Sequence, residues 1–149
     1  EYFIKRRLEG NSLSDLTEIV HIFCTSEDIN NLSYALMVQG AVQHVWAPAV
    51  RQLSEQLAEM AVAYRDVPML SRTHGQPATP TTLGKEIAVW VHRLNRQIDR
   101  DPSVPVLGKI NDATGTYAAH VFAVPGTDWV ATAKSFVVHL GLVFSPLKA

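Results

Sequence analysis

The fold is decided by residues 46–64, which read WAPAVRQLSEQLAEMAVAY. Large apolar side chains recur in this stretch at alternating spacings of four and three residues: Trp46, Val50, Leu53, Leu57, Met60 and Tyr64. This spacing predicts the seam of a helix that packs almost parallel to its neighbours in a bundle. The helical pattern runs from Glu27 to about Arg65 and contains Pro48, which lacks an N–H and clashes with the preceding turn. We therefore expect a kink or a break between about His44 and Pro48.

The segments before this helix and directly after it are shorter. A helical pattern covers Tyr2–Leu8, a loop rich in Gly, Asn and Ser covers Gly10–Ser14, and a second short helix is expected over Asp15–Phe23. Val67–Leu70 is predicted to be extended, because Pro68 biases its predecessor away from helix.

The rest of the chain also favours helices. Thr79 as a cap and proline in the first position predict a helix over residues 80–100, which Asp101–Pro105 should end. Val106–Pro125 is expected to be irregular, and a last helix is expected over Trp129–Leu140. The predicted cap and stop of that helix are Asp128 and Gly141. The predicted fold class is all-α, built on a long-helix bundle.

Composition limits the functions that this chain could have. Its 149 residues are 47% hydrophobic and 18% charged, a balance typical of a globular domain rather than a disordered chain. A net charge of −1 leaves no basic footprint, and no apolar run is long enough to span a bilayer, so neither nucleic acid nor membrane is an expected partner. The single cysteine, Cys24, favours a reducing compartment, and we expect a cytoplasmic protein. We expect no metal site and no cofactor, because His21 and Cys24 alone provide too few ligands.

Residues 71–80, SRTHGQPATP, form the first candidate site. Gly75 lets the backbone turn tightly, and His74 titrates near physiological pH, so this polar turn could transfer a proton. The alternative is a polar connector with a solvated histidine.

Residues 21–31, HIFCTSEDINN, form the second candidate site. Thr25 and Ser26 lie at the start of the long helix, where free N–H groups and the helix dipole favour an anion. The alternative is plain capping by Ser26, with Glu27 and Asp28 in the first turn.

Together these segments carry a family resemblance. TSEDIN followed by SRTHGQPATPTTLGKE, with EYFIK at the start and GKIN and GTYA later, closely resembles the adenylosuccinate lyase family of the fumarase–aspartase–argininosuccinase superfamily. The resemblance covers the chain up to about residue 120. Family members are considerably longer, so we expect a fragment, with residues 1–14 ending an N-terminal domain and residues 15–149 beginning the central helical-bundle domain.

The resemblance implies both an activity and roles for residues. The family eliminates fumarate from adenylosuccinate, giving AMP, and from its imidazole-carboxamide analogue SAICAR, giving AICAR, in purine nucleotide biosynthesis. His74 matches the catalytic histidine, to which we assign the general-acid role. The expected substrate-binding residues are Thr25, Ser26, Thr73, His21 and Gln76. His21 matches a histidine associated with the nucleotide phosphate, although a surface or capping role is the alternative.

The chain also departs from the family pattern. The serine-rich loop GSSxMPxKxNP, which carries the family's general base, does not occur in it, so the chain alone is expected to be inactive. Asp112 stands where the family usually has a small residue. Lys109, Asn111 and Tyr117 could support the site, but packing and turn formation are the simpler interpretation.

Length makes a further prediction about assembly. A helix over Glu27–Arg65 would rise about 55–60 Å if straight, with Thr25 and Ser26 at one end and His74 beyond the other. The two groups should therefore meet only across subunits. This agrees with the homotetramer that the resemblance implies, in which each site draws on three chains. For the function itself, two alternatives remain: another fumarate-releasing lyase of the superfamily, and a non-catalytic scaffold of the same fold.

Overall fold

The computed structural model describes residues 1–100 and 104–147. The chain divides into two compact units, one of Glu1–Met37 with Pro105–Ala149 and one of Val38–Val104. Most of the predicted helix stop at residues 101–105 lies outside the described residues. The domain boundary at residue 14 and the expected fragment of a bundle domain stay predictions.

The long helix predicted around residues 46–64 is present. It comprises α2 (Ser26–Ala41), the π-helical turn η2 (Val42–Trp46) and α3 (Ala47–Ala63). The irregularity expected between His44 and Pro48 is thus a π-helical turn that continues into α3. Pro48 lies in the first turn of α3, where its missing N–H costs least.

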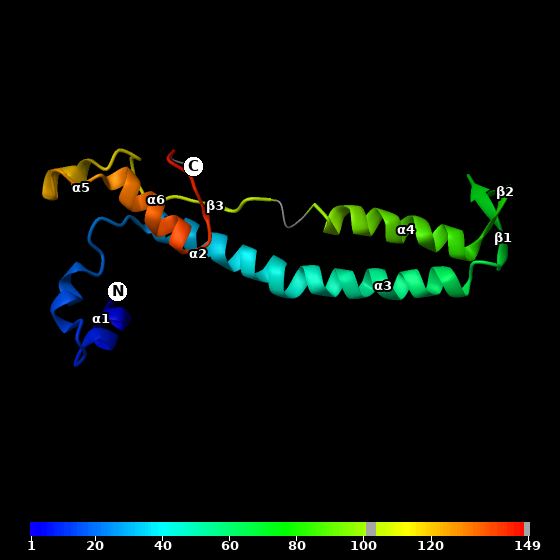
Figure 1. Ribbon diagram of the computed structural model, residues 1–149, viewed down its shortest axis with the longest axis horizontal. Coiled ribbons are helices and arrows are strands. Elements are labelled where there is room, and N and C mark those ends of the chain that lie inside the picture. Colours follow the sequence, from blue (N-terminus) through cyan, green and yellow to red (C-terminus); the bar gives the residue numbers. More distant parts are fainter. Residues whose placement is uncertain (101–103, 148–149) are drawn as a thin grey trace. The chain divides into compact units, whose positions relative to one another are not determined.

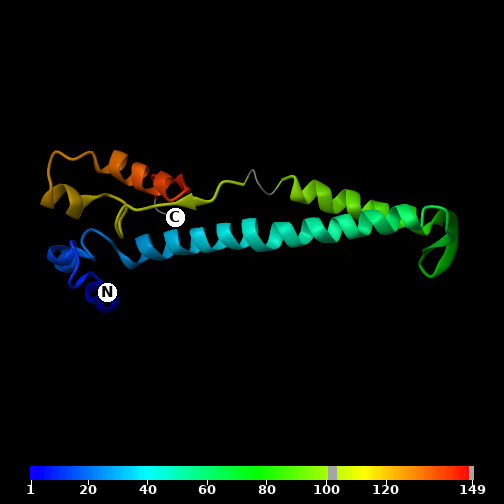
Figure 2. The same ribbon diagram turned by 60° about the horizontal axis from the view of Figure 1, so that its bottom comes forward.

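The second unit is a helical hairpin in which α4 (Leu83–Ile98) returns along α3 (Figures 1 and 2). Their contact is made by small or short side chains: Ala47 and Ser54 are buried on α3, and Ser54 Oγ lies 2.6 Å from Asn95 Oδ1 of α4. Gly84 is buried at the start of α4. A Cβ at this position would meet the carbonyl oxygen of Ala61 and lie within 2.6 Å of the Cα of Arg65.

This close approach predicts the effect of one methyl group. Gly84→Ala should destabilise the protein by about 1–3 kcal/mol, because the added Cβ overlaps backbone atoms that cannot turn aside. Thermal or urea unfolding of the purified variant measures the change. Gly40→Ala is the matched control, since a Cβ there meets nothing within 4 Å, and unchanged stability in both variants would contradict the close helix contact.

The residues of the predicted apolar seam differ in how far they are covered. Val50 and Leu57 are half-buried, whereas Trp46, Leu53, Met60 and Tyr64 are between 41% and 48% exposed. These four exposed residues form what we call the outer stripe. Only part of the predicted seam is therefore covered within the chain.

The segment in which a helix start was predicted belongs to the second strand of a two-stranded sheet. β1 (Pro68–Thr73) pairs antiparallel with β2 (Gln76–Thr82), so the prediction that Thr79 and Pro80 begin a helix is wrong. In a two-stranded ribbon both strands are edges, and a proline that donates no N–H is tolerated. The cap of α4 is instead Thr82, whose Oγ1 accepts the N–H of Lys85 at 3.2 Å.

The first unit begins with α1 (Tyr2–Leu8), as predicted. The helix expected over residues 15–23 is wrong in type and extent, because only the 3₁₀ helix η1 (Ser14–Ile19) forms there. The region expected to be irregular contains β3 (Leu107–Gly108) and α5 (Ala118–Ala123).

The predicted last helix is confirmed as α6 (Trp129–His139), capped by Asp128, whose Oδ1 accepts the N–H of Ala131 at 2.9 Å. β4 (Val143–Phe144) follows and pairs parallel with β3. The core of the unit joins α2 to α6 and the residues around β4: Leu32, Ala35, Val137 and Leu142.

The structure is therefore mostly helical, as predicted, with two small two-stranded sheets that the all-α prediction did not include. One sheet pairs neighbouring segments across the turn at His74 and Gly75, and the other pairs the distant segments β3 and β4. Among the described residues, none of the helices is both long and apolar enough to cross a membrane.

Candidate functional site

The β1–β2 turn carries the histidine that the sequence singles out. Thr73 pairs with Gln76, so His74 and Gly75 are the two residues of the turn between the strands. Both have positive φ, 50° for His74 and 78° for Gly75, as the tight turn of a two-residue hairpin requires. The tight turn is thus confirmed.

Three of the predicted site residues meet at this turn. Thr73, His74 and Gln76 are all exposed, and within the described residues their side chains have no hydrogen-bond partner. The turn presents an imidazole, a hydroxyl and an amide to solvent. These groups can donate and accept hydrogen bonds, and an imidazole is a common general acid or base.

Two more of the predicted site residues, Thr25 and Ser26, lie at the start of α2. The carbonyl of Thr25 accepts the N–H of Asp28 at 3.0 Å, and Ser26 is the first residue of the helix. Neither the Thr25 hydroxyl nor the Ser26 hydroxyl has a partner in the described parts of the chain. Plain capping by Ser26, the alternative interpretation, is therefore not seen. Both hydroxyls are available to an anion at the positive end of the helix.

Asp28, in the first turn of α2, is fully buried. One carboxylate oxygen accepts the N–H groups of Thr25 at 3.1 Å and Asp112 at 3.2 Å. The other accepts the N–H of Asn111 at 3.1 Å and the ammonium of Lys109 at 3.0 Å. A single carboxylate therefore joins the start of α2 to the loop at 109–112.

The charge state of Asp28 follows from these contacts. Burial by itself raises the pKa of this carboxyl, but the N–H groups of Thr25 and Asn111 and the Lys109 ammonium outweigh it and hold the pKa below its usual value. Asp28 is therefore ionised at neutral pH. Lys109 is also buried, so the two charges neutralise each other away from solvent.

The loop is held by a second residue of α2. The Asn31 amide accepts the N–H of Lys109 at 2.9 Å and donates to the Lys109 carbonyl at 3.1 Å. Asp112, which departs from the family pattern, has a φ of 68°, in the region that favours glycine. Its own carboxylate accepts the N–H of Ala113 at 2.7 Å, a local bond that helps aspartate tolerate this conformation.

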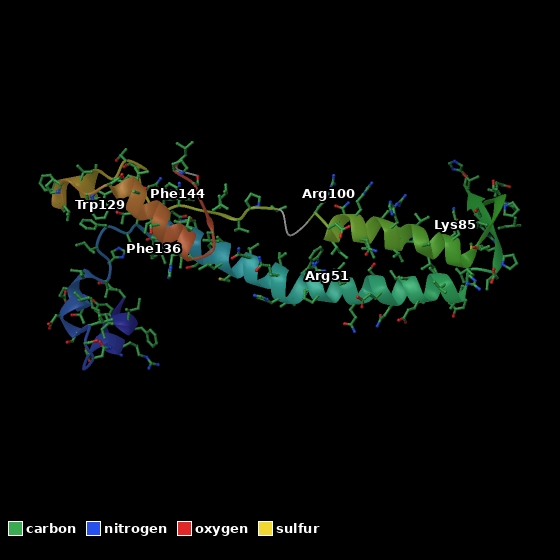
Figure 3. All side chains as sticks on the ribbon, viewed as in Figure 1. Arg51, Lys85, Arg100, Trp129, Phe136 and Phe144 are labelled. Atoms are coloured by element: carbon green, nitrogen blue, oxygen red, sulfur yellow. The ribbon has the colours of Figure 1, made fainter. Side chains whose placement is uncertain are left out.

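An aromatic cavity of about 230 Å³ lies next to this network in the first unit. His120 stacks on Phe23 with ring centroids 4.9 Å apart and meets Trp129 edge-on at 5.0 Å. Figure 3 labels Trp129 and Phe136, the two aromatic residues that α6 contributes to the lining. Burial, together with the nearby charge of Asp28, raises the pKa of the Cys24 thiol and of the Tyr117 hydroxyl. Both groups are therefore protonated at neutral pH.

Sequence reasoning missed the Asp28–Lys109 pair, which lies 81 residues apart in the chain. The only sequence signal for this pair is that both residues lie in segments that resemble the family. His21 is exposed, and its phosphate role stays a prediction. In the described part of the chain, no group of three or more His, Cys, Asp or Glu residues is arranged to hold a metal ion.

The fold and both motifs define a class of protein. The model of the family described as Lyase matches residues 1–141, and the chain belongs to this family. It is similar to the adenylosuccinate lyase of Escherichia coli K12, with 49% identity over 147 residues, and to that of Haemophilus influenzae, with 45% identity. These matches cover 98% of this chain and 32% of each relative, so the chain spans about a third of their length.

Solved structures show the same fold. A 3-carboxy-cis,cis-muconate lactonizing enzyme from Pseudomonas putida matches with a TM-score of 0.78 at 24% identity, covering 90% of this chain and 30% of that one. A fumarate lyase from Mesorhizobium sp. matches with a TM-score of 0.74 at 26% identity, covering 86% of this chain and 30% of that one. These likenesses place the helical hairpin and its strands in a fold shared by several enzymes.

Proposed function

We propose that this chain is the part of an adenylosuccinate lyase that supplies the general acid and a carboxylate-binding pair. The observation that carries the proposal is the start of α2, where the hydroxyls of Thr25 and Ser26 are unbound among the described residues and lie at the positive end of a helix. A succinyl group attached to nitrogen offers the carboxylates that such a site suits. The names of the bacterial relatives support the choice of a purine nucleotide as the rest of the substrate.

The proposed reaction is a β-elimination from adenylosuccinate that gives fumarate and AMP, with SAICAR as a second substrate. A base outside this chain removes the Cβ proton, the carbon–nitrogen bond breaks, and His74 protonates the departing nitrogen. Thr73 and Gln76, which flank His74 in the hairpin, would contact the substrate. His21 would lie near its phosphate.

We also propose that the site is completed between subunits of a homotetramer. Thr25 and Ser26 belong to the first unit, whereas His74 belongs to the second and lies beyond the end of α3, which rises about 25 Å from Ala47 to Ala63. The outer stripe supports this proposal, because apolar side chains in a row on an exposed helix face are typical of an interface between copies. Buried in such an interface, the outer stripe would form the seam of the predicted bundle. The one cysteine, Cys24, is consistent with a cytoplasmic enzyme.

Fumarate release by the full-length protein tests the function. We expect release from adenylosuccinate and SAICAR and none from argininosuccinate, because the substrate contacts proposed here follow the adenylosuccinate lyase pattern. Ultraviolet absorbance of the released fumarate and chromatography of the nucleotide product measure the reaction. Release only from a different succinyl compound would support another lyase of the superfamily, and no release from any substrate would support a scaffold.

A further inference from the structure

We propose that Asp28, charge-neutralised by Lys109, is a positioning residue that holds the Thr25–Ser26 pair ready for an anionic substrate. The inference rests on the proposed function, because it assigns the pair to substrate binding. It goes further by assigning a positioning task to a carboxylate that is fully buried.

The first argument concerns which group satisfies the N–H of Thr25. When threonine precedes a helix as its N-cap, its hydroxyl usually accepts an N–H from the first turn and is then not available to a ligand. Here the Asp28 carboxylate accepts the Thr25 N–H at 3.1 Å, and the N–H of Asp28 goes to the Thr25 carbonyl at 3.0 Å. The turn is thus held through its backbone, which leaves the Thr25 hydroxyl without a partner in the described residues.

The second argument concerns charge. An unpaired carboxylate that binds the Thr25 N–H would repel a substrate that carries carboxylates and a phosphate. The Lys109 ammonium lies 3.0 Å from Asp28, and the exposed fractions of the two side chains are 8% and 0%. The pair therefore contributes no net charge at the site, and the positive end of the α2 dipole remains to attract the anion.

The third argument concerns attachment. Asp28 also accepts the N–H groups of Asn111 and Asp112, and Asn31 separately binds both backbone groups of Lys109. The loop at 109–112 is therefore tied to α2 by two residues, of which only Asp28 also binds Thr25. A change at Asp28 can release the turn while Asn31 keeps the loop attached.

Steady-state kinetics of the full-length protein test the proposal with Asp28→Asn. The asparagine amide turns one acceptor oxygen into a donor that faces two donors, which shifts the turn at Thr25. We expect the KM for adenylosuccinate to rise between about 10-fold and about 100-fold, as for a displaced binding group, with kcat changed much less. A merely structural role would instead reduce the amount of active protein, which lowers the apparent kcat and leaves KM unchanged, and that result would overturn the proposal.

Matched variants keep the test sharp. Glu27→Gln removes an acid of the same charge from the neighbouring position and should keep the wild-type KM. The Glu27 side chain is exposed and, among the described residues, binds only Asn30. If Asp28→Asn does not fold, Asp28→Glu, which retains the charge but moves the carboxylate by one methylene, should show the same rise in KM.

A measurement without substrate separates this proposal from the proposed function. Amide hydrogen exchange at Thr25 should be slow in the wild type and in Glu27→Gln, and faster in Asp28→Asn, because the N–H loses its buried acceptor. If the wild type releases no fumarate, the proposed function fails, and exchange alone decides whether Asp28 holds the turn. Equal exchange in all three proteins would overturn the positioning role whether or not the protein is active.

Discussion

Replacing His74 with alanine in the full-length protein is expected to lower kcat by about 10²–10⁴-fold, the usual contribution of general acid–base catalysis. Without the imidazole, the departing nitrogen has no positioned proton donor. Substrate binding should change much less, because the carboxylate contacts assigned to Thr25 and Ser26 remain. Steady-state kinetics with adenylosuccinate measure both quantities.

The turn geometry supplies the control. The φ of His74 is 50°, a conformation in which asparagine is well tolerated and alanine is not. His74→Asn therefore preserves the hairpin but cannot donate a proton near neutral pH, and it should be as slow as His74→Ala. An active asparagine variant beside an inactive alanine variant would show that the histidine only shapes the turn.

Mixing two inactive proteins is expected to restore activity. Subunits with His74→Ala and subunits with both Thr25→Ala and Ser26→Ala each carry a defect in every site when assembled alone. If each site takes the two groups from different chains, random mixing leaves about a quarter of the sites without a defect. The subunits must be co-expressed, or denatured and refolded together, because large interfaces exchange slowly.

The control for this experiment is mixing without exchange. Folded parent proteins combined at the same ratio should remain nearly inactive. If the co-assembled protein is no more active than its parents, either one chain supplies both groups or the Thr25–Ser26 assignment is wrong. The kinetics of the Thr25→Ala/Ser26→Ala protein alone distinguish these outcomes, since a wrong assignment leaves it active.

The elements that could be predicted from sequence are those whose signal is local. The heptad-like spacing from Trp46 to Tyr64 predicts α3, and Pro48 marks the irregularity next to it. Asp128 predicts the start of α6 because its side chain caps the helix that directly follows. In each case the residues that determine the element lie inside it or directly next to it in the sequence.

The errors arise where two local signals compete or where the partner is distant. Thr79 and Pro80 have the composition of a helix start, but pairing with β1 places them in a strand. Composition cannot reveal that pairing, since it depends on the turn at His74 and Gly75 folding two polar segments together. The Asp28–Lys109 pair is invisible for a different reason, because its members are adjacent only after the first unit has folded.

The two-residue turn between β1 and β2 also limits which chain lengths are permitted at this point. Side chains on a strand alternate between two faces, so one inserted or deleted residue moves every following side chain of that strand to the opposite face. Thr73 and Gln76 are direct partners across the turn, and such a change would separate them. At this tip, a substitution alters the chemistry of one position, whereas an insertion alters the register of the whole ribbon. The number of residues at this tip is therefore constrained by the register of the ribbon, in addition to the constraints that the turn places on their identities.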